Sequence, residues 1–409
     1  MKKLHLLIFL IFFSGSIIAQ YNTPGTGISW DMDDLVSNSS GAVIQQDNYY
    51  SVTQDIIISA TDTLNILTGE LIKINAGLEI TFNGVLKADA EDQITFTASD
   101  TTNHFLGLRF ENSGSSVMRN VLVEFSGGIE LVESHMIIDG CVIRKNNTNN
   151  ASNALDLYHS NPNIINCTIY DNAGPAIGSG ANASSSPQIY NNEIFRNNSL
   201  NENKPQINLG TSNQTDSIRI IGNSITGFYD MAGGIAISTL YGGTLKCRIE
   251  NNQIINNRYG IAAIGSNIHS VIKNNLLKDN NIQNQPMQGG SGLNFYGSET
   301  NVALVSGNEI TGNLWGITVQ NTAMPNLGQL TGNVNPGMNQ IYGNGNSGQV
   351  YDFYNNTEND LFAENNYWGT EDLAEVEEHI YHGADDPGLG MVDYEPIYIP
   401  PVEYYETPG

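Results

Sequence analysis

Few residues of this chain have types and spacing suited to catalysis. Asp156, Tyr158 and His159 stand close together, and His159 is the best candidate for general acid or base chemistry. Arg219 and Arg248 are further candidates, because each lies four residues before an asparagine of a repeated motif. They should therefore occupy matched positions in the fold. The alternative is that both arginines are solvated surface charges.

A second group of residues could bind a metal. His379 and His382 are three residues apart, and Asp385 and Asp386 follow, so nitrogen and oxygen ligands could meet around one ion. The alternative is an ordinary capping segment in which Asp386 begins a turn. Calcium is the other candidate ion, at the acidic run of residues 31–34.

Exposed aromatic rings are candidates for glycan binding, because a flat ring stacks on the face of a sugar. The candidates are Tyr158, Tyr241, Tyr296 and Trp315. Trp368 ends the repeated motif, and we expect it to pack into the end of the core instead.

A repeated motif of Asn or Cys, any residue, then a large apolar residue occurs ten times, at intervals of 21 to 33 residues. Such a period identifies an array of stacked units. Its first positions are expected to form a structural ladder of inward side chains: Asn120, Cys141, Cys167, Asn192, Asn223, Asn252, Asn275, Asn308, Asn339 and Asn366.

Neighbouring positions decide which array this is. A leucine-rich repeat requires an apolar residue eight positions before the Asn, and none of the ten copies has one. A second phrase of alternating apolar residues, such as Gly292 to Phe295, follows each Asn slot and predicts a short half-buried strand. Each unit therefore has two or three strands and no helix, and must stack on its neighbours.

The run Ile-x-Asn-Asn-x-Ile-x-x-Asn, as in Ile189 to Asn197, resembles the repeat of right-handed parallel β-helix proteins of the pectate-lyase-like superfamily. The segment Asn365 to Thr370 is similar to the closing module of secreted bacterial members. This resemblance implies an all-β solenoid of about 10–13 rungs with two caps. It also implies that a lyase of the group would use Lys or Arg as base, beside carboxylates that hold calcium.

The predicted organisation is a signal peptide (1–19), an N-terminal cap (20–60), the β-helix (61–370) and a C-terminal capping helix with tail (371–409). Thr370 is the predicted N-cap of that helix. The formal charge is −26, and residues 279–409 contain no Lys or Arg. Nucleic acid is therefore a poor partner, and no membrane-spanning segment is predicted.

Cys141 and Cys167 occupy one slot in consecutive rungs, so they should lie one above the other. They could form a disulfide, or they could be small inward side chains in place of Asn. Cys247 stays unpaired in either case.

From Asp156 to Gln320, the outward positions of the alternating strand offer one carboxylate, whereas a glycoside hydrolase needs two. We therefore predict a secreted, monomeric, non-catalytic scaffold for adhesion or glycan binding, at the cell surface or in the periplasm. The alternative is a polysaccharide lyase or glycoside hydrolase, for which the insertions around 198–205 and 280–291 are the places to look. A third hypothesis is a periplasmic accessory protein that handles a metal.

Overall fold

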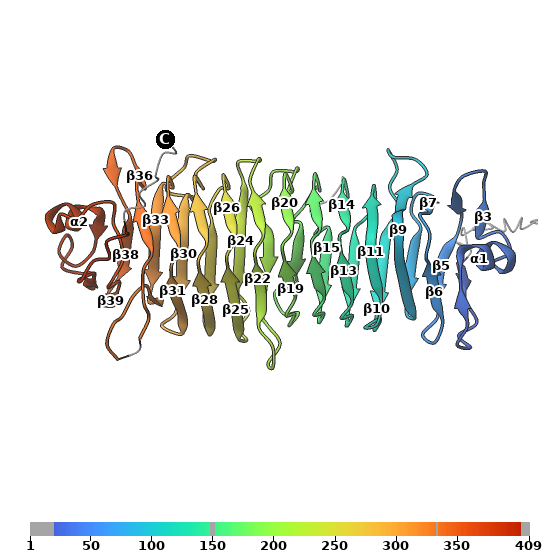
Figure 1. Ribbon diagram of the computed structural model, residues 1–409, viewed down its shortest axis with the longest axis horizontal. Helices are drawn as coiled ribbons and strands as arrows, with labels where there is room; N and C mark the ends of the chain where they lie inside the picture. The colour runs from blue at the N-terminus through green and yellow to red at the C-terminus, as the bar shows by residue number, and fades with distance from the viewer. Residues whose placement is uncertain (1–19, 148–151, 333, 402–409) are drawn as a thin grey trace, which may run out of the picture.

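A computed structural model describes residues 20–147, 152–332 and 334–401 of the chain. The predicted signal peptide and residues 402–409 of the predicted tail lie outside the described part. The molecule is a long stack of strands with a short helix at each end (Figure 1). Neither helix has the length and apolar content needed to cross a bilayer, within the part of the chain described.

Sheet A is one wall of the stack and runs from end to end. Its neighbours are parallel, and each strand follows the previous one after a full turn of the chain. The 14 strands are β1 (Gln20–Asn22), β5 (Asp55–Ile58), β8 (Glu79–Phe82), β10 (Gly107–Glu111), β12 (Ile129–Val132), β15 (Leu155–Tyr158), β18 (Ile177–Ser179), β21 (Lys204–Leu209), β24 (Ala232–Ser238), β27 (Ile261–Gly265), β30 (Ser291–Gly297), β33 (Trp315–Asn321), β38 (Phe353–Thr357) and β40 (Ile380–Tyr381).

Most of the remaining strands form two further walls, which we call face B1 and face B2. Face B1 follows sheet A in each turn and contains β2 (Ser29–Trp30), β6 (Thr63–Ile66), β13 (Ile137–Asp139), β16 (Asn163–Ile165), β19 (Gln188–Tyr190), β22 (Ile218–Ile221), β25 (Leu245–Glu250), β28 (Ile268–Lys273), β31 (Asn301–Ser306) and β34 (Met324–Asn326). Face B2 contains β4 (Tyr50–Val52), β7 (Leu71–Ile74), β14 (Val142–Arg144), β17 (Thr168–Tyr170), β20 (Glu193–Phe195), β23 (Ser224–Thr226), β26 (Gln253–Ile255), β29 (Leu276–Lys278), β32 (Glu309–Thr311) and β35 (Gln340–Tyr342). Strands β9 (Val85–Ala98) and β11 (Val117–Glu124) bend across both faces.

The core consists of equivalent apolar residues stacked along the axis. Ile143, Ile169, Ile194 and Ile225 are in register on successive strands of face B2, and none is exposed. Outward residues alternate with them, as the period of two requires. The predicted fold is confirmed: the chain is a right-handed parallel β-helix.

The corner between faces B1 and B2 holds the first asparagine ladder. From Asn223 onward each Oδ1 accepts hydrogen bonds from the backbone nitrogen and Nδ2 of the preceding member; for Asn223 both are 2.9 Å. Asn120 is a correction to the prediction. It occupies the preceding corner position, with φ of 50°, and the buried Val121 takes the inward slot. Cys141 and Cys167 are buried free thiols.

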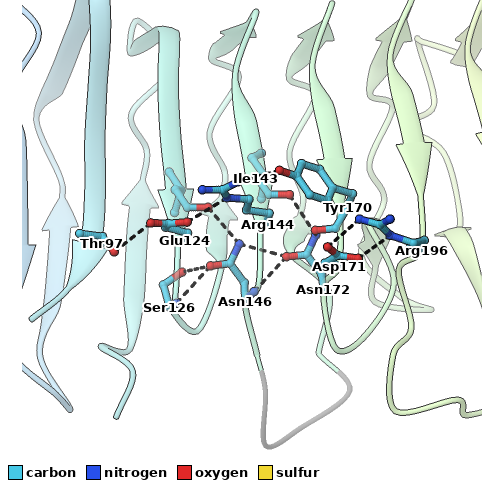
Figure 2. A network of polar contacts seen from close by, with 11 residues as sticks. Thr97, Glu124, Ser126, Ile143, Arg144, Asn146, Tyr170, Asp171, Asn172 and Arg196 are labelled. Carbon is cyan, nitrogen blue, oxygen red and sulfur yellow. Dashed lines mark hydrogen bonds and ion pairs between the residues drawn. The ribbon is translucent and has the colours of Figure 1, made fainter. Parts of the chain in front are cut away.

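A second ladder follows the corner between face B2 and sheet A. Ser126, Asn146 and Asn172 begin it, as Figure 2 shows. Members of this ladder lie five residues after those of the first. One rung lacks its asparagine, because the residue five positions after Asn223 is Phe228. There Gln206 enters from sheet A and bridges the gap, accepting from Asn197 and donating to Asn257 at 3.1 and 3.2 Å.

Both ends of the solenoid differ in detail from the prediction. Sheet A already begins at β1, so stacking starts before residue 61, and α1 (Met32–Asn38) with β3 (Val43–Gln45) covers that end (Figure 1). At the other end α2 (Leu373–His379) is capped by Asp372, whose Oδ1 accepts from the nitrogen of Ala374 at 2.9 Å. Thr370 is therefore not the N-cap. Two antiparallel strands, β36 (Gly345–Asn346) and β37 (Gln349–Val350), form a hairpin, and β39 (Leu361–Phe362) pairs with β41 (Val392–Asp393).

Candidate functional site

The predicted catalytic residues lie on different walls. Asp156 faces outward on β15 of sheet A, whereas Arg219 and Arg248 are in register on face B1. Arg248 forms an ion pair with Glu250 at 2.5 Å, and Arg219 donates to Gln188. The structure therefore does not bring the arginines to Asp156.

His159 lies at the corner after β15, where its backbone has φ of 49°. Its ring packs edge-on against Tyr158, at 4.3 Å between centroids. It lines a shallow corner pocket of about 560 Å³ together with Glu133 and His135. The backbone nitrogen of Asn161 donates to Nδ1 of His135 at 3.0 Å. His159 is thus beside sheet A, but not on the same surface as Asp156.

The predicted metal ligands at the C-terminal end have separate partners. His382 is buried, with Nδ1 accepting from the nitrogen of Val392 and Nε2 lying 3.1 Å from Glu377. His379 points instead toward Asp352. Asp385 accepts from the backbone nitrogen of His382, and Asp386 from that of Gly388. Among the described residues, no group of three or more His, Cys, Asp or Glu could hold a metal ion.

Sheet A carries a set of charged residues of which only Asp156 was predicted from the sequence. Arg109, Glu130 and Asp156 are in register on β10, β12 and β15. Glu79 on β8 is in register with Gly107, which lies two residues before Arg109. Glu79, Glu130 and Asp156 line a pocket of about 170 Å³, which we call the carboxylate pocket.

Glycine forms the floor of the carboxylate pocket. Gly107 has φ of 132°, and a Cβ atom there would lie 2.4 Å from the carbonyl oxygen of Gly128 on the next rung. No other residue fits such an approach. The space between Glu79 and Glu130 therefore stays open.

The carboxylates of this pocket differ in their electrostatic surroundings. Partial burial, with the charge of Glu130 nearby, raises the pKa of Asp156, although Asn153 donates to it at 2.8 Å. Burial also raises the pKa of Glu79. Glu130 instead forms an ion pair with Arg109. Two carboxyl groups with raised pKa values thus flank one that is paired with a cation.

Arg109 is unsuited to act as a base. Partial burial works against its charge, but hydrogen bonds and ion pairs with Glu111 and Glu130 outweigh burial and raise its pKa further. A guanidinium held in this way stays protonated. It can orient a carboxylate or bind an anion.

A larger groove lies farther along sheet A, and we call it the aromatic groove. Its volume is about 450 Å³. Rings gather at one end: Trp315 packs on Tyr351 and Tyr354, with centroids 4.6 and 5.2 Å away, and Tyr354 stacks on Tyr381 at 5.0 Å. Outward amide and hydroxyl side chains of sheet A complete the lining: Asn294, Thr318, Gln320 and Asn356.

The predicted glycan-binding residues are only partly together. Trp315 lines the aromatic groove, and Tyr296 is in register with Gln320 of its lining. Tyr158 lies several rungs away on β15, and Tyr241 is on an exposed turn after β24. Both predicted insertions reach the groove, one through Asn203 and the other through Pro286 to Gly289.

The carboxylate pocket and the aromatic groove share one outward column of sheet A. The strand pairing continues from rung to rung without a break between the two sites. At the pocket end the paired residues are Arg109, Glu130 and Asp156, and at the groove end they are Asn294, Thr318, Tyr354 and Tyr381. The intervening positions are small: Gly178, Asn208, Ala236 and Ala262. At about 4.8 Å per rung, some 34 Å separates Asp156 from Tyr354.

The fold and this column define a right-handed parallel β-helix protein whose sheet A bears two polar sites. No family model and no curated protein matches the sequence. Among solved structures, the chain is similar to the periplasmic alginate epimerase AlgG, with 12% identity over 90% of this chain and 82% of that one and a TM-score of 0.41. A point mutant of AlgG gives 10% identity, 90% and 83% coverage and a TM-score of 0.46. An alginate lyase from Paenibacillus sp. str. FPU-7 has 12% identity over 93% of this chain and 99% of that one, with a TM-score of 0.27. At such low identity the similarity concerns the fold alone, and no residue role is carried over to this chain.

Proposed function

We propose that this protein binds a polysaccharide along sheet A and cleaves it at the carboxylate pocket. The observation that carries this proposal is the single outward column with clustered carboxylates at one end and an aromatic groove at the other. A long ligand lying along the axis would contact both. The proposal places the enzymatic alternative ahead of the non-catalytic scaffold. The outward positions from Asp156 onward offered a single carboxylate, and the strands of sheet A before Asp156 add Glu79 and Glu130.

The chemistry that fits the carboxylate pocket is hydrolysis of a glycosidic bond. Such a reaction needs one protonated carboxyl group as acid and one carboxylate as base or nucleophile. The raised pKa values of Asp156 and Glu79 suit the acid, and Glu130, which forms an ion pair with Arg109, is the candidate base or nucleophile. β-Elimination is less well supported, because Arg109 stays protonated.

The binding half of the proposal rests on the aromatic groove. Trp315 and Tyr354 offer ring faces for sugar stacking, and Asn294, Gln320 and Asn356 offer donors and acceptors for hydroxyl groups. A polysaccharide substrate would be met outside the cytoplasm, and the predicted signal peptide agrees with export to the surface or periplasm.

The test is incubation of the purified protein with a panel of neutral and acidic polysaccharides, with calcium or with EDTA. New reducing ends report hydrolysis, and absorbance of unsaturated products reports elimination. We expect reducing ends without unsaturation, and their loss in Glu130→Gln. Glu193→Gln, an equivalent change on face B2, is the matched control. If no polysaccharide is cleaved but Trp315→Ala abolishes retention on an immobilised glycan, the binding scaffold is the correct function.

A further inference from the structure

Arg258 is an unusual residue in the wall of the aromatic groove. Its side chain is 5% exposed, yet among the described residues no carboxylate forms an ion pair with it. Its partners are neutral. Nε donates to Gln283 at 2.6 Å, Nη1 donates to Asn203, and Nη2 donates to the carbonyl oxygen of Gln288 at 2.6 Å.

An uncompensated buried charge is costly, and folding normally avoids it by supplying a counter-ion. This chain has ample counter-ions, with 42 Asp and Glu against 16 Lys and Arg. None of the acids lines the aromatic groove, as far as the described residues show. Arg258 is therefore the one charged side chain among the described residues that line the groove of this strongly acidic protein.

The side chain of Arg258 is fixed before any ligand arrives. Both insertions contribute to this, since Asn203 belongs to the first, and Gln283 and Gln288 to the second. Gly289 packs against it, and a Cβ atom at that position would lie 3.2 Å from Cγ of Arg258. A guanidinium has five N–H donors, and the three acceptors account for one on each nitrogen. One donor on each terminal nitrogen remains for a ligand.

We infer that the aromatic groove takes an acidic glycan, and that Arg258 binds the anionic substituent of a sugar ring stacked near Trp315. This inference rests on the proposed glycan-binding function of the groove and names its substrate class. The shared chemistry is a carboxylate or sulfate oxygen pair, which matches the planar fork of a guanidinium. The net charge of the protein repels polyanions, so selectivity for them requires such a local cation.

Matched ligands test the inference with the wild-type protein alone. Oligogalacturonate and its methyl ester differ by the carboxylate charge, and dextran sulfate and dextran differ by the sulfate. Calorimetric titration should give affinity at least about tenfold higher for the charged member of one pair. The pair that shows the difference identifies carboxylate or sulfate. Equal affinity within both pairs, or preference for the neutral members, would overturn the inference.

Variants separate this inference from the proposed function. Arg258→Gln should abolish the preference for the charged member and leave neutral binding, whereas Trp315→Ala should weaken both. Arg219→Gln, an exposed arginine on face B1, is the control and should change neither. A preference that survives in folded Arg258→Gln would assign the anion to another residue. If melting shows that Arg258→Gln is unfolded, Arg258→Lys keeps the charge but not the planar fork, so it should weaken the preference, and an undiminished preference would overturn the role of the fork. Wild-type protein that binds no glycan would refute the groove itself and the inference with it.

Discussion

Nδ1 of His379 lies 3.1 Å from Oδ2 of Asp352, where the second asparagine ladder ends. The other oxygen of Asp352 accepts from the backbone nitrogen and Nδ2 of Asn344 at 3.0 and 2.8 Å. The ladder thus ends in a carboxylate that is joined to the closing helix α2. The hydrogen bond with Asp352 raises the pKa of His379 above its ordinary 6.5, and burial raises the pKa of Asp352.

The C-terminal end should be most stable when His379 is protonated. Because its pKa is raised in the folded state, the contribution is complete below about pH 6.5 and is lost as the pH rises through the raised value. Hydrogen exchange of α2 should accelerate as the pH rises through the raised pKa of His379, beyond the intrinsic base catalysis. Asp352→Asn keeps the ladder acceptor but removes the charge, and should flatten this dependence. Equal pH profiles in the two proteins would show that the pair contributes nothing.

The first ladder should be a main source of stability. Nδ2 of Asn252 donates to Ile220 and Asn275, and its Oδ1 accepts twice from Asn223. Asn252→Ala leaves these buried groups without partners, so urea unfolding should show a loss of about 2–4 kcal/mol. Asn251→Gly is the control. Asn251 is exposed with φ of 57°, which glycine adopts readily, so we expect a change within about 0.5 kcal/mol. Similar losses in both variants would contradict the ladder's role.

The repeat could be recognised from the sequence because stacking places the same residue type at the same slot in each rung. The period does not, however, fix every position. Asn120 matches the motif by letter, but Arg119 pairs with Asp139 and Leu122 with Val142, so the rung is shifted by one residue against the motif and Val121 faces inward. Such a shift depends on backbone geometry, which the pattern of residue types does not contain.

The candidate site was harder to predict for a related reason. Glu79 and Arg109 precede the first copy of the motif at Asn120, and the outward column predicted from the sequence begins at Asp156, after Glu130. The alternation in Leu108-Arg109-Phe110-Glu111 was a usable signal. Arg258 gave no signal, because its burial depends on two insertions that meet only in the folded chain.

Gln206 should act as a member of the second ladder although it comes from a different wall. It accepts from Asn197 and donates to Thr226 and Asn257, at 3.1, 2.7 and 3.2 Å. Gln206→Ala removes all three bonds in a buried place, and thermal or urea unfolding should report a loss of about 1–3 kcal/mol. Gln253→Ala, at an exposed position of face B2, should be nearly neutral. If the two variants are equally stable, the gap in the ladder tolerates unpaired groups.

Asp156 should control the pH dependence of cleavage. Its raised pKa keeps the carboxyl group protonated to a higher pH than usual, so a general acid at this position loses activity as the pH rises through that value. Asp156→Asn should lower the turnover of a cleaved polysaccharide by about 10²–10⁴ and remove this alkaline limb. Binding in the aromatic groove, measured by calorimetry, should be unchanged because Asp156 lies several rungs away.

Glu79→Gln is the companion variant, since the pKa of Glu79 is also raised. If only Glu79→Gln removes the limb, Glu79 is the acid. If neither variant alters turnover, the chemistry lies outside the carboxylate pocket.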